Sequence, residues 1–110
     1  QQVISIEELK KAIAEKTVTL IDLSGYENYL KGHLPLSLNG YENNIISKLP
    51  TTKNNLIVFY FPPGEIYGWS KFQELTFMCS SNKRFKLLDR CMVFTGGIPE
   101  WLECGGKLEK

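Results

Sequence analysis

The sequence predicts an α/β fold, with an open, mainly parallel sheet of about four to five strands and helices on both faces. Helix-like and strand-like segments alternate along the chain, which is the pattern of parallel strands joined by helical crossovers. Two of the strand-like segments are almost continuously apolar, as expected of strands that are covered on both faces. Because no repeat, low-complexity tract or linker divides the chain, we expect residues 1–110 to form one domain.

The expected helices carry their own boundary signals. Ser5 and Glu8 fit a capping box, and apolar spacing continues the first helix to about Glu15. Pro50 ends a second apolar repeat, and two glycines follow the last helix. The expected helical segments are 6–15, one turn over 26–30, then 41–49, 67–78 and 98–103, with 83–88 either a short helix or an irregular connector.

The expected strands differ in strength. Residues 56–61 read Leu-Ile-Val-Phe-Tyr-Phe, the strongest strand pattern in the chain, and we place this strand at the centre of the sheet. A polar loop over 51–55 precedes it, and Pro62-Pro63-Gly64 ends it sharply. The other expected strands are 17–23, a short extended segment at 36–38, and 91–94.

Charge and composition exclude several classes of function. Thirteen Lys+Arg against twelve Asp+Glu leave a net charge of +1, and Arg84 and Arg90 are the only arginines. Phosphate neutralisation needs clustered positive charge, so we expect no nucleic-acid partner. No apolar run approaches the roughly 20 residues of a membrane span, so we expect none in this segment.

The three cysteines do not form a recognisable site. Cys79, Cys91 and Cys104 lie far apart and far from His33, the single histidine, so we expect no metal and no other cofactor. Cys79 and Cys91 are predicted to be buried as small apolar side chains, and Cys104 to be more exposed on the closing helix. Reduced thiols and the lack of a signal peptide favour a cytoplasmic location.

His33 and Asp22 each have a structural and a chemical interpretation. A lone histidine without a nucleophile has nothing to activate, so we favour a ring nitrogen of His33 bound to nearby backbone. Asp22, at a strand end, is a candidate metal ligand or acid/base group. Since it has no partner carboxylate at useful spacing, a hydrogen bond that organises the following loop is favoured.

Ligands of open parallel sheets bind beyond the carboxyl ends of the strands. The candidate site is therefore the loop after the central strand. Aromatic and proline residues there suggest a stiff surface that anchors a partner. In the competing interpretation, the ring of Phe61 only fills space in the core while Tyr67 and Trp69 pack on the first turn of the following helix. The candidate residues are Phe61, Pro62, Pro63, Gly64, Glu65, Ile66, Tyr67 and Trp69.

Five segments in this order and spacing resemble a rhodanese-like domain over nearly the whole chain. They are Ile4-Ser5-x-Glu7-Glu8-Leu9, Leu20-Ile21-Asp22-Leu23, Tyr29-x-x-Gly32-His33-Leu34-Pro35, Leu56-Ile57-Val58-Phe59-Tyr60, and Phe94-Thr95-Gly96-Gly97-Ile98-Pro99-Glu100-Trp101 with Gly105.

The resemblance implies a catalytic loop of the form Cys-x-x-Gly-x-Arg-Ser, whose thiolate carries a sulfane sulfur. Here Phe61 stands at the cysteine position, and only Gly64 is retained. Ile66 replaces the arginine and Tyr67 the serine. The family's second arginine, shortly after the first strand's aspartate, is replaced by Ser24. A phenyl ring can be neither a thiolate nor a persulfide.

The sequence thus predicts a catalytically silent rhodanese-like domain that recognises or regulates another protein or other domains of a longer chain. The first alternative is a divergent sulfur carrier or sulfurtransferase that uses Cys104 or Cys79. The second is a purely structural domain whose loop binds nothing. Whether the chain is an enzyme stays open between them.

Overall fold

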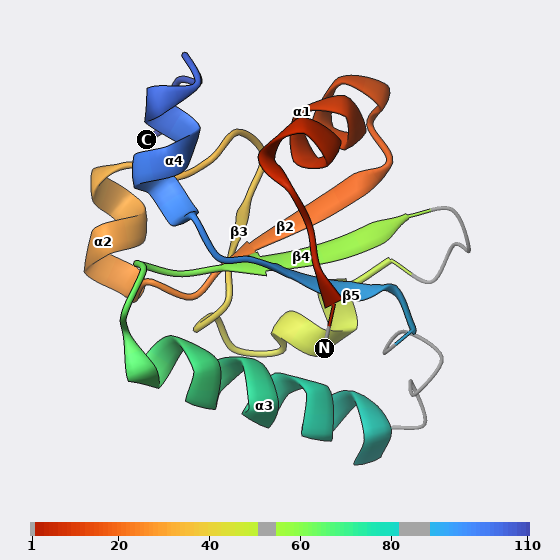
Figure 1. The fold of residues 1–110 in the computed structure, drawn as a ribbon. Helices are drawn as coiled ribbons and strands as arrows, with labels where there is room; N and C mark the ends of the chain where they lie inside the picture. Colours follow the sequence, from red (N-terminus) through yellow and green to blue (C-terminus); the bar gives the residue numbers. More distant parts are fainter. Residues whose placement is uncertain (1, 51–54, 82–88) are drawn as a thin grey trace.

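The computed structural model describes residues 2–50, 55–81 and 89–110. Within them, five strands, all parallel, form one sheet in the order β1-β5-β4-β2-β3. This architecture confirms the expected α/β fold (Figure 1). The elements are β1 (Gln2–Val3), α1 (Ile6–Glu15), β2 (Val18–Asp22), α2 (Tyr26–Lys31), β3 (Leu38–Asn39), the 3₁₀ helix η1 (Ile45–Lys48), β4 (Leu56–Tyr60), α3 (Ile66–Ser81), β5 (Cys91–Phe94) and α4 (Gly97–Glu103).

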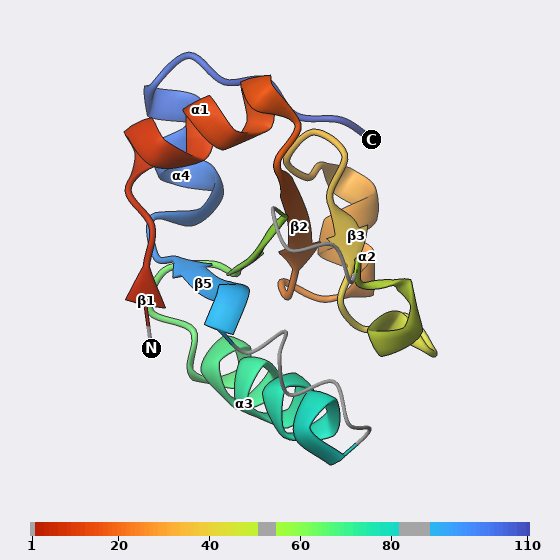
Figure 2. The same ribbon diagram turned by 90° about the vertical axis from the view of Figure 1, so that its right-hand side faces the viewer.

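Helical segments cover the sheet on both faces. α1 and α4 lie on one face, and α3 and η1 on the other (Figures 1 and 2). Side chains of the central strand alternate between the two cores: Ile57 and Phe59 join the α3 side, and Val58 and Tyr60 join the α1 side. The unbroken apolar run of β4 follows from this arrangement, because both of its faces are buried.

The start of α1 is organised as its sequence predicts. The Ser5 hydroxyl accepts the N–H of Glu8 at 3.1 Å, and the Ser5 N–H donates to the Glu8 carboxylate at 3.2 Å. This reciprocal capping box satisfies two helix-end donors. The predicted end at Glu15 is also confirmed.

The predicted helix over 41–49 is wrong for most of its length. Only Ile45–Lys48 is helical, as one 3₁₀ turn. Asn44 adopts a left-handed conformation (φ 62°), which interrupts a helix. Before it, Asn39 takes up two backbone N–H groups, those of Tyr41 on its side chain and Glu42 on its carbonyl. The apolar residues Ile45, Ile46 and Leu49 are buried in the core, so their spacing reflects burial of one turn rather than a long helix.

Other elements also differ from the sequence prediction: β4 ends at Tyr60 rather than at residue 61, and β2, α2 and α4 differ by one residue at one or both ends. β3 occupies Leu38–Asn39 rather than 36–38, because Leu36 has a φ of 63° that no strand residue adopts. β1 was not predicted; two residues pair in parallel with β5 and form one edge. α3 begins and ends beyond the predicted 67–78. The predicted loop residues 51–54 and the segment 83–88 lie outside the described residues.

A buried hydrogen-bond network ties the segment before β3 to the sheet. The Tyr60 hydroxyl donates to Asp22 Oδ2 at 2.8 Å and accepts the Leu34 N–H at 2.9 Å. It also lies 3.1 Å from the Ser37 hydroxyl. Burial, followed by the charge of Asp22, raises the pKa of Tyr60 far above its usual value, so this hydroxyl keeps its proton.

We expect Tyr60→Phe to destabilise the protein by about 1–3 kcal/mol, because the Leu34 N–H and an oxygen of Asp22 lose a buried partner. Urea unfolding followed by circular dichroism measures the change. Tyr26→Phe is the matched control, since Tyr26 is exposed. If the two variants unfold at the same urea concentration, the network contributes nothing to stability.

Candidate functional site

The candidate loop runs from the end of β4 to the start of α3, at the carboxyl edge of the sheet (Figure 1). It divides into a buried and an exposed part. Phe61 is only 4% exposed, whereas Ile66 is 81% and Tyr67 44% exposed. Pro63 and Gly64 are exposed as well, and Pro62, Glu65 and Trp69 are half-buried.

Phe61 packs beneath the first turn of α3. Its ring meets Trp69 edge to face, with the ring centroids 5.2 Å apart. Gly68 lies directly against it, since a Cβ at this glycine would stand 2.3 Å from Phe61 Cγ. On the backbone side, a Cβ at Gly97 would stand 2.8 Å from the Phe61 carbonyl oxygen. Gly97, the first residue of α4, and Gly68, in the first turn of α3, thus both accommodate residue 61 by lacking a side chain.

The loop backbone offers few donors to an anion. Pro62 and Pro63 have no N–H group. The Glu65 N–H already donates to the Pro62 carbonyl at 3.1 Å within a turn. Gly64 holds a φ of 85°, which favours glycine. The carboxylate of Glu65 adds negative charge to the loop, so the arrangement disfavours a bound anion.

Beside the loop, the turn after β2 is held by hydrogen bonds among its own residues. Ser24 is buried, and both its N–H (2.7 Å) and its hydroxyl donate to Asp22 Oδ1. Its carbonyl accepts the Asn28 side chain at 2.9 Å. Asp22 therefore organises this turn, as expected. An open cavity of about 310 Å³ lies here, lined by Ser24, Asn28, Lys31, Gly32, Pro62, Ile98 and Leu108.

His33 has the predicted structural role. Its Nδ1 lies 2.8 Å from the Tyr29 carbonyl oxygen, and its ring stacks on Tyr29 with the centroids 3.8 Å apart. Its backbone forms an antiparallel bridge with Glu109, which brings the C-terminal residues beside the segment after α2. None of these contacts reaches the candidate loop.

The cysteines lie where the sequence predicts. Cys79 is 1% and Cys91 8% exposed, and Cys104 is exposed at the end of α4. Burial, with a smaller contribution from Cys79, raises the pKa of Cys91 to about 12. At a rise of 1.5 Å per residue, Cys79 lies about 20 Å along α3 from its first residue, and Cys104, the C-cap of α4, lies about 10 Å from the first residue of that helix.

In the described ranges 2–50, 55–81 and 89–110, no group of three or more His, Cys, Asp or Glu side chains is placed to hold a metal ion. No helix in the same ranges has both the length and the apolarity to cross a membrane.

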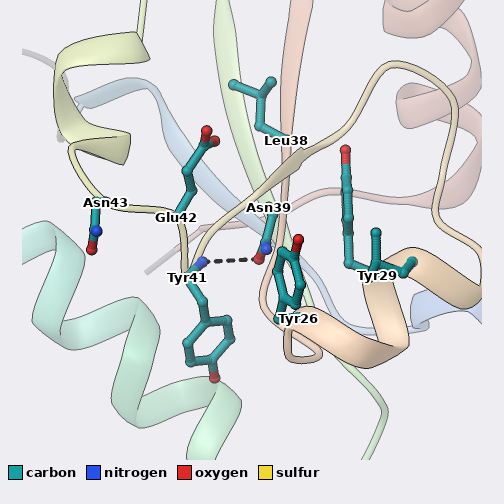
Figure 3. Close-up of a pocket in the computed structure, with 8 residues that line it drawn as sticks. Tyr26, Tyr29, Leu38, Asn39, Tyr41, Glu42 and Asn43 are labelled. Atoms are coloured by element: carbon teal, nitrogen blue, oxygen red, sulfur yellow. Dashed lines mark hydrogen bonds between the residues drawn. The ribbon is translucent and has the colours of Figure 1, made fainter.

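A second cavity, of about 550 Å³, was not predicted from the sequence (Figure 3). It opens beside the edge strand β3 and is built from α2, β3 and the turn after β3. Its residues form no sequence motif, because the fold alone brings these segments together. It is lined by Tyr26, Tyr29, Leu30, Leu38, Asn39, Tyr41, Glu42 and Asn43.

A family model described as "Rhodanese-like domain" matches residues 5–104. None of the curated proteins matches the sequence. Among solved structures, a rhodanese-related protein from Thermoplasma volcanium is similar with a TM-score of 0.67 and 17% identity, covering 99% of this chain and 98% of that one.

Two other solved structures are similar. The human single-domain sulfurtransferase TSTD1 has a TM-score of 0.60 and 19% identity, over 94% of this chain and 96% of its own. The BH2092 protein from Bacillus halodurans has a TM-score of 0.69 and 20% identity, over 98% of this chain and 76% of its own. At these identities the likeness shows the fold.

Burial predicts that the exposed thiol of Cys104 reacts faster than the buried thiol of Cys91. We expect iodoacetamide at pH 8 to modify Cys104 at least tenfold faster than Cys91, because Cys91 is buried and its thiolate is disfavoured. Intact mass and peptide mapping over time measure both rates, and unfolding in urea should make them equal. Comparable rates in the folded protein would contradict the burial of Cys91.

Proposed function

The chain belongs to the rhodanese-like domain family, and from this premise we propose that it is a catalytically silent member that acts as a protein-interaction or regulatory module. The observation that carries the proposal is Phe61, a buried phenyl ring at the position of the family's nucleophilic cysteine. The partner is another protein or another domain of a longer chain.

Loss of the nucleophile is accompanied by loss of the groups that would assist it. A persulfide and its donor are anionic, so active family members surround them with cations and N–H donors. Here Ile66 and Ser24 stand at the two arginine positions, and Ile66 is exposed without any charge to offer. Two loop positions are prolines, which removes two N–H groups from the backbone.

The space that a catalytic thiol and its bound sulfur would need is also filled. Phe61 lies against Gly68 and Trp69, and the same cluster of apolar side chains continues into the core under α3. Opening an anion pocket here would expose this ring or leave a cavity, and emptying a buried phenylalanine site costs about 3–5 kcal/mol. The ring therefore stabilises the fold at the position where active relatives carry the nucleophilic cysteine.

The exposed part of the loop supports a role in recognition. Pro63, Ile66 and Tyr67, here called the loop surface, present apolar and aromatic groups to solvent. Prolines limit the conformations of this segment, which lowers the entropy lost on binding. Tyrosine is a frequent anchor in protein interfaces because it combines a large apolar ring with a hydroxyl.

The alternative function, a divergent sulfur carrier, rests on the exposure of Cys104. A thiol must reach solvent to accept sulfur from a donor, and Cys104 meets this requirement, whereas Cys79 is 1% exposed. The sulfur acceptor would then lie at the C-terminal end of α4, whereas the candidate loop packs against the N-terminal end of this helix.

We expect no thiocyanate formation from thiosulfate and cyanide above a buffer blank. Phe61→Cys should stay at least 100-fold below an active relative such as the human single-domain sulfurtransferase, because the new thiol gains neither cations nor the missing amides. Activity in the unmodified chain that disappears in Cys104→Ser would overturn the proposal. So would a gain of one sulfur atom (about 32 Da) on Cys104 after incubation with a sulfur donor.

For recognition, we expect the double variant Ile66→Ser, Tyr67→Ala to lose partners that the unmodified chain retains in quantitative affinity purification. Phe77→Ser is the matched control, since Phe77 is a 72% exposed apolar side chain on the same helix, far from the loop. Trp69 is left unchanged because its ring packs on Phe61. Identical partner lists for the double variant and the control would favour a purely structural domain.

A further inference from the structure

The cavity beside β3, here called the edge pocket, has walls of different chemistry. Figure 3 shows Tyr29 and Glu42 on opposite sides of a gap, with Leu38 and Asn39 between them at its floor. Tyr26 lies below Tyr29 on the same helix, and the ring of Tyr41 points away toward α3. The pocket therefore pairs an aromatic wall with a carboxylate wall.

The aromatic wall is rigid. One face of the Tyr29 ring stacks on His33 with an interplanar angle of 4°, and its hydroxyl donates to the Ser37 carbonyl at 2.6 Å. Because the ring is held at one face and at its tip, the other face is kept turned toward the pocket (Figure 3). A flat π surface that needs no rearrangement is a platform for a second planar group.

The lining of the pocket contributes one carboxylate. Among the described residues that line it, Glu42 is the one with a charged side chain. Burial raises the pKa of Tyr29, and the charges of Asp22, Glu42 and Glu109 raise it further. Of these three carboxylates, Glu42 is the one that lines the pocket and can pair with a bound cation.

We infer that the edge pocket binds the guanidinium group of an arginine side chain presented by a partner protein. Guanidinium is planar and cationic, so it can stack on the open face of Tyr29 while its N–H groups reach a carboxylate. Glu42 supplies the carboxylate, and Asn39, whose Oδ1 already accepts the Tyr41 N–H, lies at the floor between the two walls. A lysine ammonium has the charge but lacks the flat surface for stacking.

Two lysines already lie near the pocket. Lys48 forms an ion pair with Glu42, but both side chains are nearly half exposed, and such pairs contribute only about 0–1 kcal/mol. An arginine can therefore compete with Lys48 for this carboxylate. Lys71 lies 5.0 Å from the centroid of the Tyr41 ring, a cation–π contact at the rim, on the ring that points out of the pocket.

The inference goes beyond the proposed function, because no residue of the loop surface lines the edge pocket. Binding here does not depend on whether the domain transfers sulfur. Its test can therefore use the isolated chain and a small probe, and it can fail while the loop surface still captures partners.

The probe is the capped tripeptide acetyl-Gly-Arg-Gly-amide, titrated into the ¹⁵N-labelled chain and followed by amide chemical shifts. We expect saturable shifts at Asn39, Glu42 and Asn43. The citrulline tripeptide, which keeps the shape without the charge, should bind at least tenfold more weakly, and the lysine tripeptide several-fold more weakly. Equal affinity for citrulline, equal affinity for lysine, or shifts elsewhere would overturn the inference.

Two carboxylates give a matched pair of variants, since each forms an exposed ion pair with a lysine. Glu42→Gln should weaken binding of the arginine tripeptide about tenfold, and Glu74→Gln should leave it unchanged. Lys48→Ala should strengthen binding several-fold, because it removes the competing cation. Loss of affinity in Glu74→Gln equal to that in Glu42→Gln would show a response to overall charge only, and would overturn the inference.

Discussion

Burial of both faces of the central strand is the constraint from which the rest of this fold follows. β4 lies between β5 and β2, and its side chains alternate between a core under α3 and a core under α1 and α4. Each face must be covered to keep residues such as Phe59 and Val58 from water. The covering helices have to connect to strand ends, and so the carboxyl end of β4 becomes the place where the loop, α3 and the start of α4 meet.

At that meeting point residue 61 is part of the hydrophobic core. Residue 61 continues the apolar alternation of β4 by one step and joins the core under α3. Gly68 and Gly97 make room for it, and Trp69 closes against its edge. What remains outside is a stiff segment with apolar side chains directed to solvent. The phenyl ring of Phe61 is thus buried because it follows the strand into the core, and Ile66 is exposed because the chain has by then left the sheet.

Polar groups in this small domain are used to fix the edge of the sheet. Tyr60 reaches from the central strand to Asp22, Leu34 and Ser37, and so holds the segment that leads to β3. Tyr29 is fixed in turn by Ser37 and His33. The aromatic wall of the edge pocket is therefore connected to the core through a continuous set of hydrogen bonds and ring contacts, which is why it can be rigid although β3 has only two residues.

The sequence alone determined the fold class, the family and the position of the loop, because these depend on local signals: a continuous apolar run, a proline break and motifs of fixed spacing. It also predicted the burial of Cys79 and Cys91 from their places on apolar segments. Tertiary structure decided the rest. The apolar spacing of 45, 46 and 49 was insufficient to show that Asn44 would break the helix, and two residues of β1 are too few to form a pattern. The edge pocket could not be predicted, because its walls come from three segments whose side chains meet only after β3 has paired with β2.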